Sequence, residues 1–206
     1  MFKGLVLHLD AINSMQIIFG LYERETYAYL RKLSAGIESA VDIGAAEGEF
    51  SIYFRKTAGA KKVLAFEPHP ENRDTFQTNL RLNGLNTDEN LEVIMKYLGQ
   101  REGQEWSTLD SFVTTLREPI VVKMDVDGGE VDVLLGADSL LSLSRVRLLI
   151  ETHSLELESQ CKAILEGYGF VTKIIYNAWW RRLIKDQRPI GHNRWIIGYR
   201  PSERLL

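Results

Sequence analysis

The stretch Ala40-Val-Asp-Ile-Gly-Ala-Ala-Glu-Gly-Glu-Phe50 constrains this chain most, together with Val63-Leu-Ala-Phe-Glu67 further along. The two segments predict a buried strand, a glycine-rich turn, a helix and a second strand that ends in a carboxylate. Gly44 and Gly48 allow a left-handed backbone or the close approach of another group. The carboxylate of Glu67 can accept hydrogen bonds from both hydroxyls of a ribose. A nucleoside site is therefore expected at this turn.

The turn reads Asp42-x-Gly44-x-x-x-Gly48, without the close Gly-x-Gly pair that lets a backbone approach a pyrophosphate. A nucleoside without a diphosphate therefore fits better than NAD, which disfavours a dehydrogenase. S-adenosylmethionine is the expected cofactor, and a methyltransferase is the expected class of enzyme.

Size and composition fit one globular unit. The 206 residues, 45% hydrophobic and 26% charged, are typical of a single domain. We expect the S-adenosylmethionine-binding domain over residues 36–206, after an N-terminal helical extension over residues 1–35. The formal net charge of −3 argues against a large nucleic-acid footprint. The single Cys161 excludes an internal disulfide and favours a reducing, cytoplasmic location.

The start of the chain makes a poor signal peptide, because His8 and Asp10 interrupt its apolar stretch. No apolar run reaches the roughly 20 residues that a membrane span needs. Within the N-terminal extension, apolar residues at helical spacing predict helix, with a break at Gly20. These apolar residues are Ile17, Ile18, Leu21, Tyr22, Tyr29, Leu30 and Leu33.

Beyond the extension, apolar strands alternate with amphipathic helices, which predicts a parallel sheet with right-handed crossovers. The expected strands are 40–43, 62–66, 91–97, 119–125, 146–152, 170–176 and 194–199. The expected helices are 48–57, 71–83, 108–116, 130–141 and 155–167. No long helix separates the last two strands, so they are expected to pair antiparallel. The predicted fold is the α/β, Rossmann-like class I methyltransferase sheet of seven mostly parallel strands, with a C-terminal antiparallel hairpin and helices on both faces.

Six motifs carry a family resemblance, and most of them fall at the carboxyl ends of these strands, where open α/β sheets bind ligands. They are Asp42-Ile-Gly-Ala-Ala-Glu-Gly48, Phe66-Glu-Pro-His-Pro70, Asn79 to Gly84, Thr108-Leu-Asp-Ser-Phe112, Lys123-Met-Asp-Val-Asp-Gly-Gly-Glu130 and Ile150-Glu-Thr-His153. Together they resemble the FkbM-type S-adenosylmethionine-dependent methyltransferases, from about Gly20 to Tyr199. The Thr-Leu-Asp-x-Phe and Lys-x-Asp-x-Asp-Gly-x-Glu segments are the most specific part. The family commonly has Asn where this chain has Ala46.

The resemblance and the turn together predict a set of cofactor-binding residues. Gly44 and Gly48 would admit the methionine part, Asp42 would hold its ammonium or the loop backbone, and Glu67 would bind the ribose. Tyr22 and Glu23 lie in an entry segment that closes over the cofactor in similar sequences. The full set is Tyr22, Glu23, Asp42, Gly44, Ala45, Gly48, Glu67, Pro68 and Asp125.

The strand 119–125 is unusual, because a central parallel strand is normally apolar and here Lys123 and Asp125 share one face. A buried ammonium needs a carboxylate partner. Either the two residues form a structural ion pair, or Asp125 lies beside the transferred methyl and Lys123 tunes it. Glu151 and His153 share one face at the end of the next strand, and His153 or Asp125 is the expected general base.

The acids Asp127 and Glu130 flank two glycines at a helix start, where carboxylates are favoured in any case. With Asp125 and Glu151 they could collect Mg²⁺. A cluster of carboxylates alone does not predict a metal, so none is expected.

The acceptor is expected to be a small molecule, a sugar or a lipid-linked group that is methylated on oxygen. The alternatives are an RNA methyltransferase and a non-catalytic protein that binds S-adenosylmethionine. The loop 177–193 is basic and aromatic, so it could bind an anionic or sugar-like acceptor or RNA. We favour a third interpretation, in which its tryptophans cover the sheet edge and its charges are solvated. Its aromatic and basic residues are Trp179, Trp180, Arg181, Arg182, Lys185, Arg188 and His192.

Overall fold

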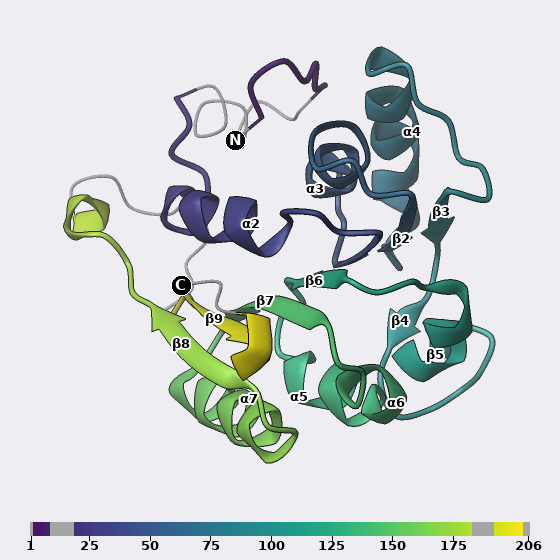
Figure 1. Cartoon of the computed structure of the whole chain (residues 1–206). Helices are drawn as coiled ribbons and strands as arrows, with labels where there is room; N and C mark the ends of the chain where they lie inside the picture. Colours follow the sequence, from purple (N-terminus) through teal and green to yellow (C-terminus); the bar gives the residue numbers. More distant parts are fainter. Residues whose placement is uncertain (1, 9–18, 183–191, 204–206) are drawn as a thin grey trace.

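The computed structural model describes residues 2–8, 19–182 and 192–203, and its centre is a seven-stranded sheet (Figure 1). The strand order is β3-β2-β1-β6-β7-β9-β8. The strands are β1 Ser39–Ile43, β2 Lys62–Phe66, β3 Leu91–Ile94, β6 Ile120–Met124, β7 Val146–Thr152, β8 Val171–Ile175 and β9 Arg194–Tyr199. All neighbours pair in parallel except β7 with β9 and β8 with β9, which are antiparallel. The predicted fold class and all seven predicted strands are confirmed.

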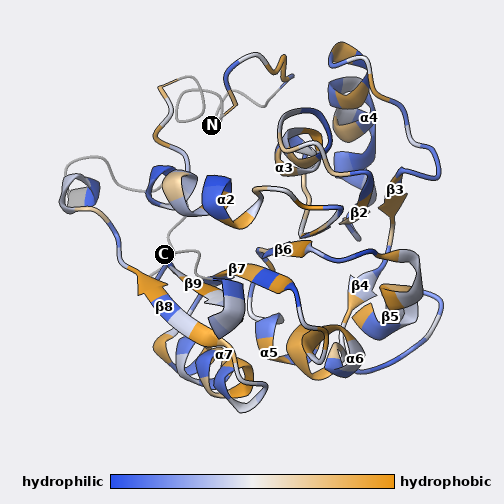
Figure 2. Ribbon diagram, viewed as in Figure 1, coloured by the Kyte–Doolittle hydropathy of each residue, from blue (hydrophilic) through white to orange (hydrophobic). Residues whose placement is uncertain are grey.

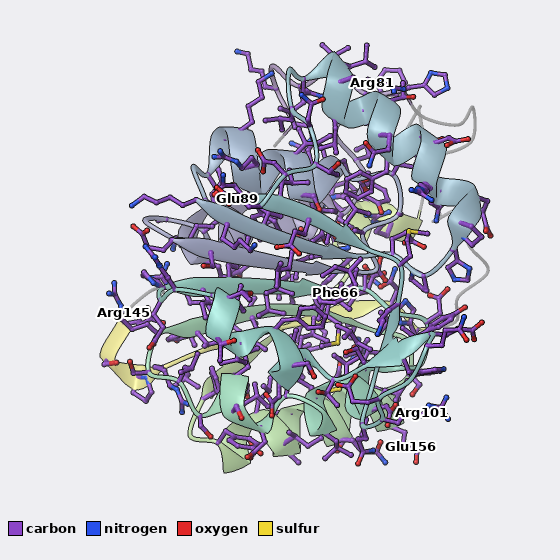
Figure 3. The ribbon with its side chains drawn as sticks, turned by 90° about the vertical axis from the view of Figure 1, so that its right-hand side faces the viewer. Phe66, Arg81, Glu89, Arg101, Arg145 and Glu156 are labelled. Atoms are coloured by element: carbon purple, nitrogen blue, oxygen red, sulfur yellow. The ribbon has the colours of Figure 1, made fainter. Side chains whose placement is uncertain are left out.

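Each central strand buries both faces, because alternate side chains enter two separate apolar cores. Val41 and Ile43 pack on the side of helices α5, α6 and α7, whereas Ala40 lies in the core on the side of α2, α3 and α4. Hydropathy colouring shows both colours along α4 and α7, as expected for helices with one solvated side (Figure 2). Phe66 lies inside the molecule, and the labelled charged side chains lie at its periphery (Figure 3).

The helices follow the predicted order with shifted bounds. They are α2 Tyr27–Leu33, α3 Glu49–Ile52, α4 Arg73–Leu82, α5 Glu130–Leu135, α6 Asp138–Leu141 and α7 Leu155–Gly167. The expected single helix over 130–141 is two helices, because the chain turns at Gly136 and Ala137. The expected helix over 108–116 is a 3₁₀ helix, Leu109–Thr115. The stretch expected to be helical over 48–57 continues beyond α3 as a π-helix, Tyr53–Thr57.

Two further differences concern the edges of the fold. The expected strand 91–97 stops at Ile94, and Tyr97–Leu98 (β4) instead pairs with Trp106–Ser107 (β5) in a separate two-stranded sheet. In the described part of the N-terminal extension, helix is confined to Arg24–Leu33, and the pattern at Ile17 and Ile18 lies outside the described residues. Within the described ranges, no helix combines the length and apolar character needed to cross a membrane.

The segment 2–8 docks on α4 through two buried asparagines. The side chain of Asn83 accepts from the backbone N–H of Val6 at 3.1 Å and donates to its carbonyl at 2.7 Å. Asn79 makes the same pair of bonds with the backbone of His8. The side-chain amides therefore act as surrogate strand partners for the start of the chain.

The strand order changes direction between β1 and β6, and this switch point positions the site. In open α/β sheets the crevice beyond such a point, at the carboxyl ends of the strands, is the usual ligand position. Here β1, β2, β6 and β7 all point their carboxyl ends to the same edge, since they are mutually parallel. The residues that follow each strand therefore meet there.

Gly44 is required at the end of β1 for a steric reason that can be tested. A Cβ on Gly44 would lie 1.8 Å from the carbonyl oxygen of Asp125, and its φ is +73°. Gly36 has a similar φ of +65°, but a Cβ there would meet nothing within 4 Å. Gly36→Ala should therefore cost only the left-handed backbone term of about 1–2 kcal/mol in the free energy of unfolding.

We expect Gly44→Ala to lower the free energy of unfolding by at least about 2 kcal/mol more than Gly36→Ala, because it adds a backbone clash to the same strain. Urea denaturation of both variants measures the difference. Equal losses would show that the ends of β1 and β6 do not need this close contact.

Candidate functional site

A cleft of about 450 Å³ lies beyond the carboxyl ends of β1, β2 and β6. Its wall contains Gly44 from the turn after β1, Glu67 and Pro68 from the end of β2, and Asp125 from the end of β6. The remaining wall residues come mainly from the segment around β4 and β5 and from the start of α5. The cleft therefore lies where the sheet topology places a ligand.

Glu67 is held in one position by two backbone groups. Its Oε2 accepts a hydrogen bond from the N–H of Ala46 at 2.8 Å, and its Oε1 accepts one from the N–H of His69 at 2.9 Å. The residue is buried, yet it forms part of the cleft wall. Each carboxylate oxygen has a second lone pair, so both can still accept from a ligand hydroxyl. The carboxylate is thus oriented before any ligand arrives.

The turn between β1 and α3 combines two left-handed glycines with a strained alanine. The N–H groups of Gly44 and Ala45 both donate to the carbonyl of Phe66, at 2.9 and 3.0 Å, so the turn is joined to the end of β2. Ala46 has a φ of +44°, a region that Asn adopts more readily than Ala. Gly48, with a φ of +87°, begins α3. Asn at position 46 would therefore relieve strain here.

Lys123 is a buried ammonium in the middle of β6, only 3% exposed. It pairs with Asp125 at 3.6 Å, and its Nζ lies 4.5 Å from the centroid of the Phe50 ring. Burial alone would lower its pKa, but the charges of Asp125 and Glu23 and of further carboxylates outweigh burial and raise the pKa above its usual value. Lys123 therefore stays charged, and the carboxylates around it depend on that charge.

Behind the turn, several buried acids lie close to Lys123. Asp42 accepts from the Ser51 hydroxyl at 2.6 Å, and burial raises its pKa. Burial also raises the pKa of Glu23 and of Glu49 to about 7, although Lys123 acts in the opposite direction on both. Burial therefore opposes the ionisation of these acids, and a cationic ligand close to them would stabilise their charged forms.

Tyr22 and Glu23 come from the entry segment, as the family resemblance implies, and both face this buried acidic region. Glu23 has a left-handed φ of +44° at the start of the first 3₁₀ turn. Burial and the charge of Glu23 raise the pKa of Tyr22 well above its usual value. Neither residue forms part of the 450 Å³ cleft.

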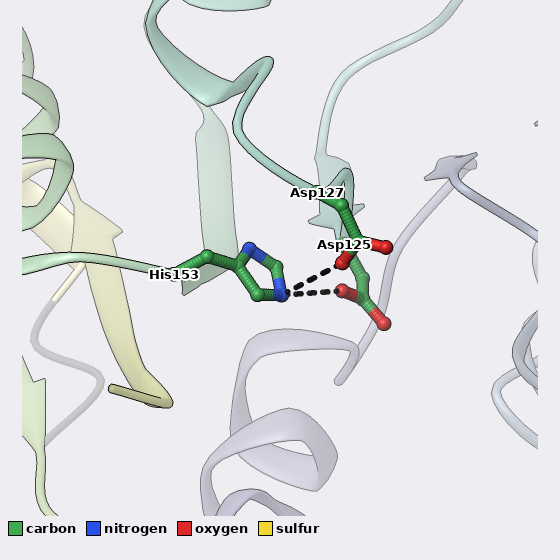
Figure 4. Close-up of side chains that lie close together, drawn as sticks. All are labelled: Asp125, Asp127 and His153. Carbon is green, nitrogen blue, oxygen red and sulfur yellow. Dashed lines mark ion pairs between the residues drawn. The ribbon is translucent and has the colours of Figure 1, made fainter. Parts of the chain in front are cut away.

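His153 follows β7 and lies close to several carboxylates, of which Figure 4 shows Asp125 and Asp127. Its Nδ1 lies 2.6 Å from Oε1 of Glu130, and its Nε2 lies 3.5 Å from Asp125 and 3.2 Å from Asp127. Burial acts to lower the pKa of His153, but the hydrogen bond with Glu130 and the charges of Asp125 and Glu151 outweigh burial and raise it. The imidazole thus joins the ends of β6 and β7 at the border of the cleft.

Glu151 is buried and lies two residues before His153, on the same face of the strand. Its Oε2 accepts a hydrogen bond from the indole N–H of Trp195 at 3.1 Å, and its Oε1 lies 3.8 Å from Nε2 of His153. Trp195 is directly opposite Glu151 in the antiparallel β7–β9 pair. Glu151 therefore connects His153 to the terminal hairpin.

The structure brings most of the predicted site residues to one edge but divides them into two groups. Gly44, Glu67, Pro68 and Asp125 line the cleft. The others lie behind it or at its border, and these are Tyr22, Glu23, Asp42, Ala45, Gly48, Lys123, Glu151 and His153.

The sequence analysis did not identify the aromatic wall of the cleft. Tyr97 and Trp106 both line it and stack at 5.0 Å between ring centroids, with an interplanar angle of 25°. The guanidinium of Arg101 lies over the Trp106 ring, 3.7 Å from its centroid. This wall depends on the two-residue strands β4 and β5, which are too short to give a periodic signal.

The loop 177–193 differs from the expectation that its tryptophans are covered and its charges solvated. Trp179 is 76% exposed. Arg181 instead forms a two-bond ion pair with Glu25, at 2.9 and 3.0 Å, and its guanidinium also donates to the Leu21 carbonyl. Lys185 and Arg188 lie outside the described residues. Arg181 therefore links this loop to the entry segment, and its guanidinium charge is paired within the protein.

Comparison with known proteins agrees with the fold and with the predicted family. Residues 100–177 match the family model of the methyltransferase FkbM domain, a shorter stretch than the predicted likeness but one that holds its most specific motifs. A search of curated protein sequences found no match.

Three solved structures illustrate the structural likeness. The methyltransferase FkbM from Methylobacillus flagellatus KT has a TM-score of 0.63 and 18% identity over 94% of this chain, which spans 56% of that longer protein. A methyltransferase from Pyrococcus furiosus has a TM-score of 0.57 and 14% identity, covering 96% of this chain and 89% of the other. TrmK of M. capricolum, solved with S-adenosyl-homocysteine, has a TM-score of 0.54 and 14% identity over 86% of this chain and 67% of the other.

Glu49 offers a pH-dependent test of the buried acidic region. Its folded-state pKa of about 7 lies above the value of an unfolded glutamate, so its ionisation opposes folding once the pH rises above about 4.5. The loss of stability is complete above pH 7. Glu49→Gln should therefore stabilise the protein more at pH 8 than at pH 5, by a difference on the order of 2 kcal/mol.

Urea denaturation of wild type and Glu49→Gln at the two pH values measures this difference. Glu47→Gln, two residues earlier in the same turn, serves as a control for charge removal. A gain for Glu49→Gln that does not change with pH would mean that Glu49 is already ionised in the folded protein at pH 5.

Proposed function

We propose that this chain, with its FkbM-domain match over residues 100–177 and its class I fold, is an S-adenosylmethionine-dependent methyltransferase that acts on the oxygen of a small-molecule, sugar or lipid-linked acceptor. The observation that carries the proposal is the orientation of Glu67. A buried carboxylate, fixed by the N–H groups of Ala46 and His69 and still facing a cleft, is suited to a ribose diol.

The cofactor fits the cleft in one direction. With the ribose at Glu67, the adenine would lie along the wall made by Tyr97, Leu98 and Trp106, which supplies flat apolar surface. The methionine part would pass Gly44, which lines the cleft. Its ammonium and the sulfonium would then lie on the side of the cleft behind which Asp42, Glu23 and the other acids are buried, and their positive charge would favour the ionised acids.

The reaction is an in-line displacement. A lone pair of the acceptor oxygen forms a bond to the methyl carbon while the carbon–sulfur bond breaks and its electron pair returns to sulfur. The products are the methyl ether and S-adenosylhomocysteine, and the hydroxyl proton leaves the acceptor. We place the acceptor oxygen beside Asp125 and His153, which lie at the border of the cleft. Positioning of the two reactants can contribute about 7–11 kcal/mol to lowering the barrier.

Lys123 and Glu151 are proposed to position these two residues. Lys123 fixes the direction of the Asp125 side chain through the 3.6 Å contact. Glu151 lies 3.8 Å from the His153 ring and is itself held by Trp195. Because Lys123 and Glu151 are almost fully buried, removing either charge would leave an uncompensated partner.

The other functions weighed from the sequence have less support. The Arg181–Glu25 ion pair withdraws a basic group from the surface that an RNA acceptor would need. A nucleophilic-cysteine mechanism is disfavoured because Cys161 is buried in α7, and burial raises the pKa of its thiol to about 12. A protein that binds the cofactor without turnover would bind S-adenosylhomocysteine yet transfer no methyl group.

Replacement of Glu67 tests the cofactor site. Hydrogen bonds to a charged acceptor contribute about 1.5–3 kcal/mol each, and 1.4 kcal/mol is one decade in affinity. Glu67→Ala should therefore weaken S-adenosylhomocysteine binding at least tenfold in isothermal titration calorimetry. Glu71→Ala, an exposed glutamate on the 3₁₀ turn Pro70–Asn72, is the control and should bind as wild type does. Unchanged affinity in Glu67→Ala would remove the ribose role.

Replacement of His153 tests the acceptor side. The acceptor is first identified by incubating cell extract with the protein and S-adenosylmethionine labelled in its methyl group. With that acceptor, His153→Ala should lower kcat by at least about 10²-fold, because the group that handles the acceptor proton contributes about 10²–10⁴-fold. Its affinity for S-adenosylhomocysteine should remain within a few-fold of wild type. Full turnover would place the chemistry elsewhere.

A further inference from the structure

The group Asp125, Asp127 and His153 has a geometry that a proton relay does not explain. The three side chains come from the ends of β6 and β7 and converge on one point beside the cleft (Figure 4). One carboxylate oxygen from each aspartate and Nε2 of the histidine all lie within 4.8 Å of one another. Asp125 and Asp127 also line the cleft itself.

We propose that Asp125, Asp127 and His153 bind a divalent cation of the Mg²⁺ or Mn²⁺ type, and that this cation holds the oxygen of the methyl acceptor. The inference rests on the proposed methyltransferase function and specifies how its acceptor site works. The sequence analysis expected no metal, because a cluster of carboxylates alone carries no such prediction. The orientation of His153 supplies the additional evidence.

The first argument is the position of Nε2 of His153, which faces Asp125 and Asp127 without a hydrogen bond. The 2.6 Å contact of Nδ1 with a Glu130 oxygen requires a proton between them, which the imidazole donates. The side chain is 91% buried, at 9% exposure, and its Nε2 makes no hydrogen bond among the described residues although two carboxylate oxygens lie at 3.2 and 3.5 Å. Two carboxylates that face Nε2 favour a positive charge between them. A proton on Nε2 makes no hydrogen bond in this geometry, whereas a metal ion could bind Nε2 and both carboxylates together.

The second argument is the support of the ring by Glu130. A histidine that binds a metal usually donates its other ring N–H to a carboxylate or carbonyl, which fixes the tautomer and the ring plane. Glu130 is fully buried at the start of α5 and makes this contact. The arrangement Glu130–His153–cation therefore has the second layer that a metal site requires.

The third argument is spacing. Two ligands bound at about 2.0–2.2 Å with an angle between them of about 90–110° lie about 3.0–3.5 Å apart. The Nε2 distances to Asp127 and Asp125 fall in this interval. Two carboxylate oxygens and one imidazole nitrogen suit Mn²⁺ well and Mg²⁺ with added water. Asp127, 76% exposed, lies on the solvent side, where water and the acceptor oxygen would complete the coordination.

The chemistry follows from the cation's charge. An acceptor hydroxyl bound to the cation has a lowered pKa, and its proton passes to solvent water on the side of Asp127. The resulting oxygen anion, held by the cation, attacks the methyl carbon as the carbon–sulfur bond breaks. The electron pair returns to sulfur, and the methyl ether then leaves the cation. In this scheme His153 acts on the acceptor proton as a ligand of the cation, and His153→Ala lowers kcat because the cation that acidifies the acceptor hydroxyl is lost.

The experiment uses full-length protein treated with EDTA and then desalted. Mn²⁺ is added, and the signal of free Mn²⁺ is followed by electron paramagnetic resonance, with and without saturating S-adenosylhomocysteine. We expect one bound Mn²⁺ per chain. Asp127→Asn and His153→Gln should each weaken binding at least about tenfold. Asp74→Asn, an exposed aspartate on α4 outside the cleft wall, is the matched control and should bind Mn²⁺ as wild type does.

Asp127→Asn is the decisive variant, since its exposed side chain can be changed without threatening the fold. Loss of Mn²⁺ in this variant, with retention in Asp74→Asn, supports the site. No binding to wild type up to about 1 mM Mn²⁺ under both conditions overturns it, and so does equal binding by wild type and Asp127→Asn. Calorimetry with S-adenosylhomocysteine separates the two proposals. If the nucleoside binds and Mn²⁺ does not, only the cation site fails, whereas absence of nucleoside binding rejects the proposed function.

Discussion

One buried ammonium, that of Lys123, makes the carboxylate-rich edge of the sheet possible. It lies in a central strand where apolar residues are the rule, and Asp42 is directly beside it in the β1–β6 pair. Removing one partner of a buried ion pair typically costs about 3–5 kcal/mol, because the other charge is left without compensation. The acids around Lys123 could not all remain close together in its absence. The negative site is therefore built around a single positive charge that belongs to the scaffold.

The buried acids near the cleft determine how a cationic ligand would be oriented in it. Behind the turn, Glu23 and Glu49 have pKa values raised to about 7 because burial disfavours their charge. A ligand that carries a sulfonium and an ammonium would supply the positive charge that these acids lack. Beyond Asp125, the second negative region at His153 and Asp127 is compensated in our account by a divalent cation. The cleft thus lies between two places that favour cations, and Glu67 fixes the neutral ribose between them.

Much of this arrangement could be predicted from sequence, because it depends on local patterns and on topology. The alternation of strands and helices gave the seven strands in their correct segments, and parallel pairing places Asp42, Glu67, Asp125 and His153 at one edge. The shared face of Lys123 and Asp125 follows from the two-residue period of a strand. An ion pair between them was one of the two interpretations of the sequence, and the structure contains this ion pair.

Other features depend on contacts that no local pattern encodes. The aromatic wall of Tyr97 and Trp106 is formed by two-residue strands that pair only because the third strand ends early at Ile94. The Arg181–Glu25 ion pair joins segments far apart in the chain, so a basic loop appeared solvated when one of its charges is in fact paired. The orientation of the His153 ring toward Glu130 requires coordinates, since spacing alone leaves a strand-end histidine equally suited to base and ligand.

A crystal structure of the protein with S-adenosylhomocysteine tests the central claim most directly. The account predicts both ribose hydroxyls on the Glu67 carboxylate, adenine along Tyr97 and Trp106, and the amino-acid part beside Gly44 directed toward Asp42. Density for the nucleoside at any other place, or a ribose that makes no contact with Glu67, would contradict it.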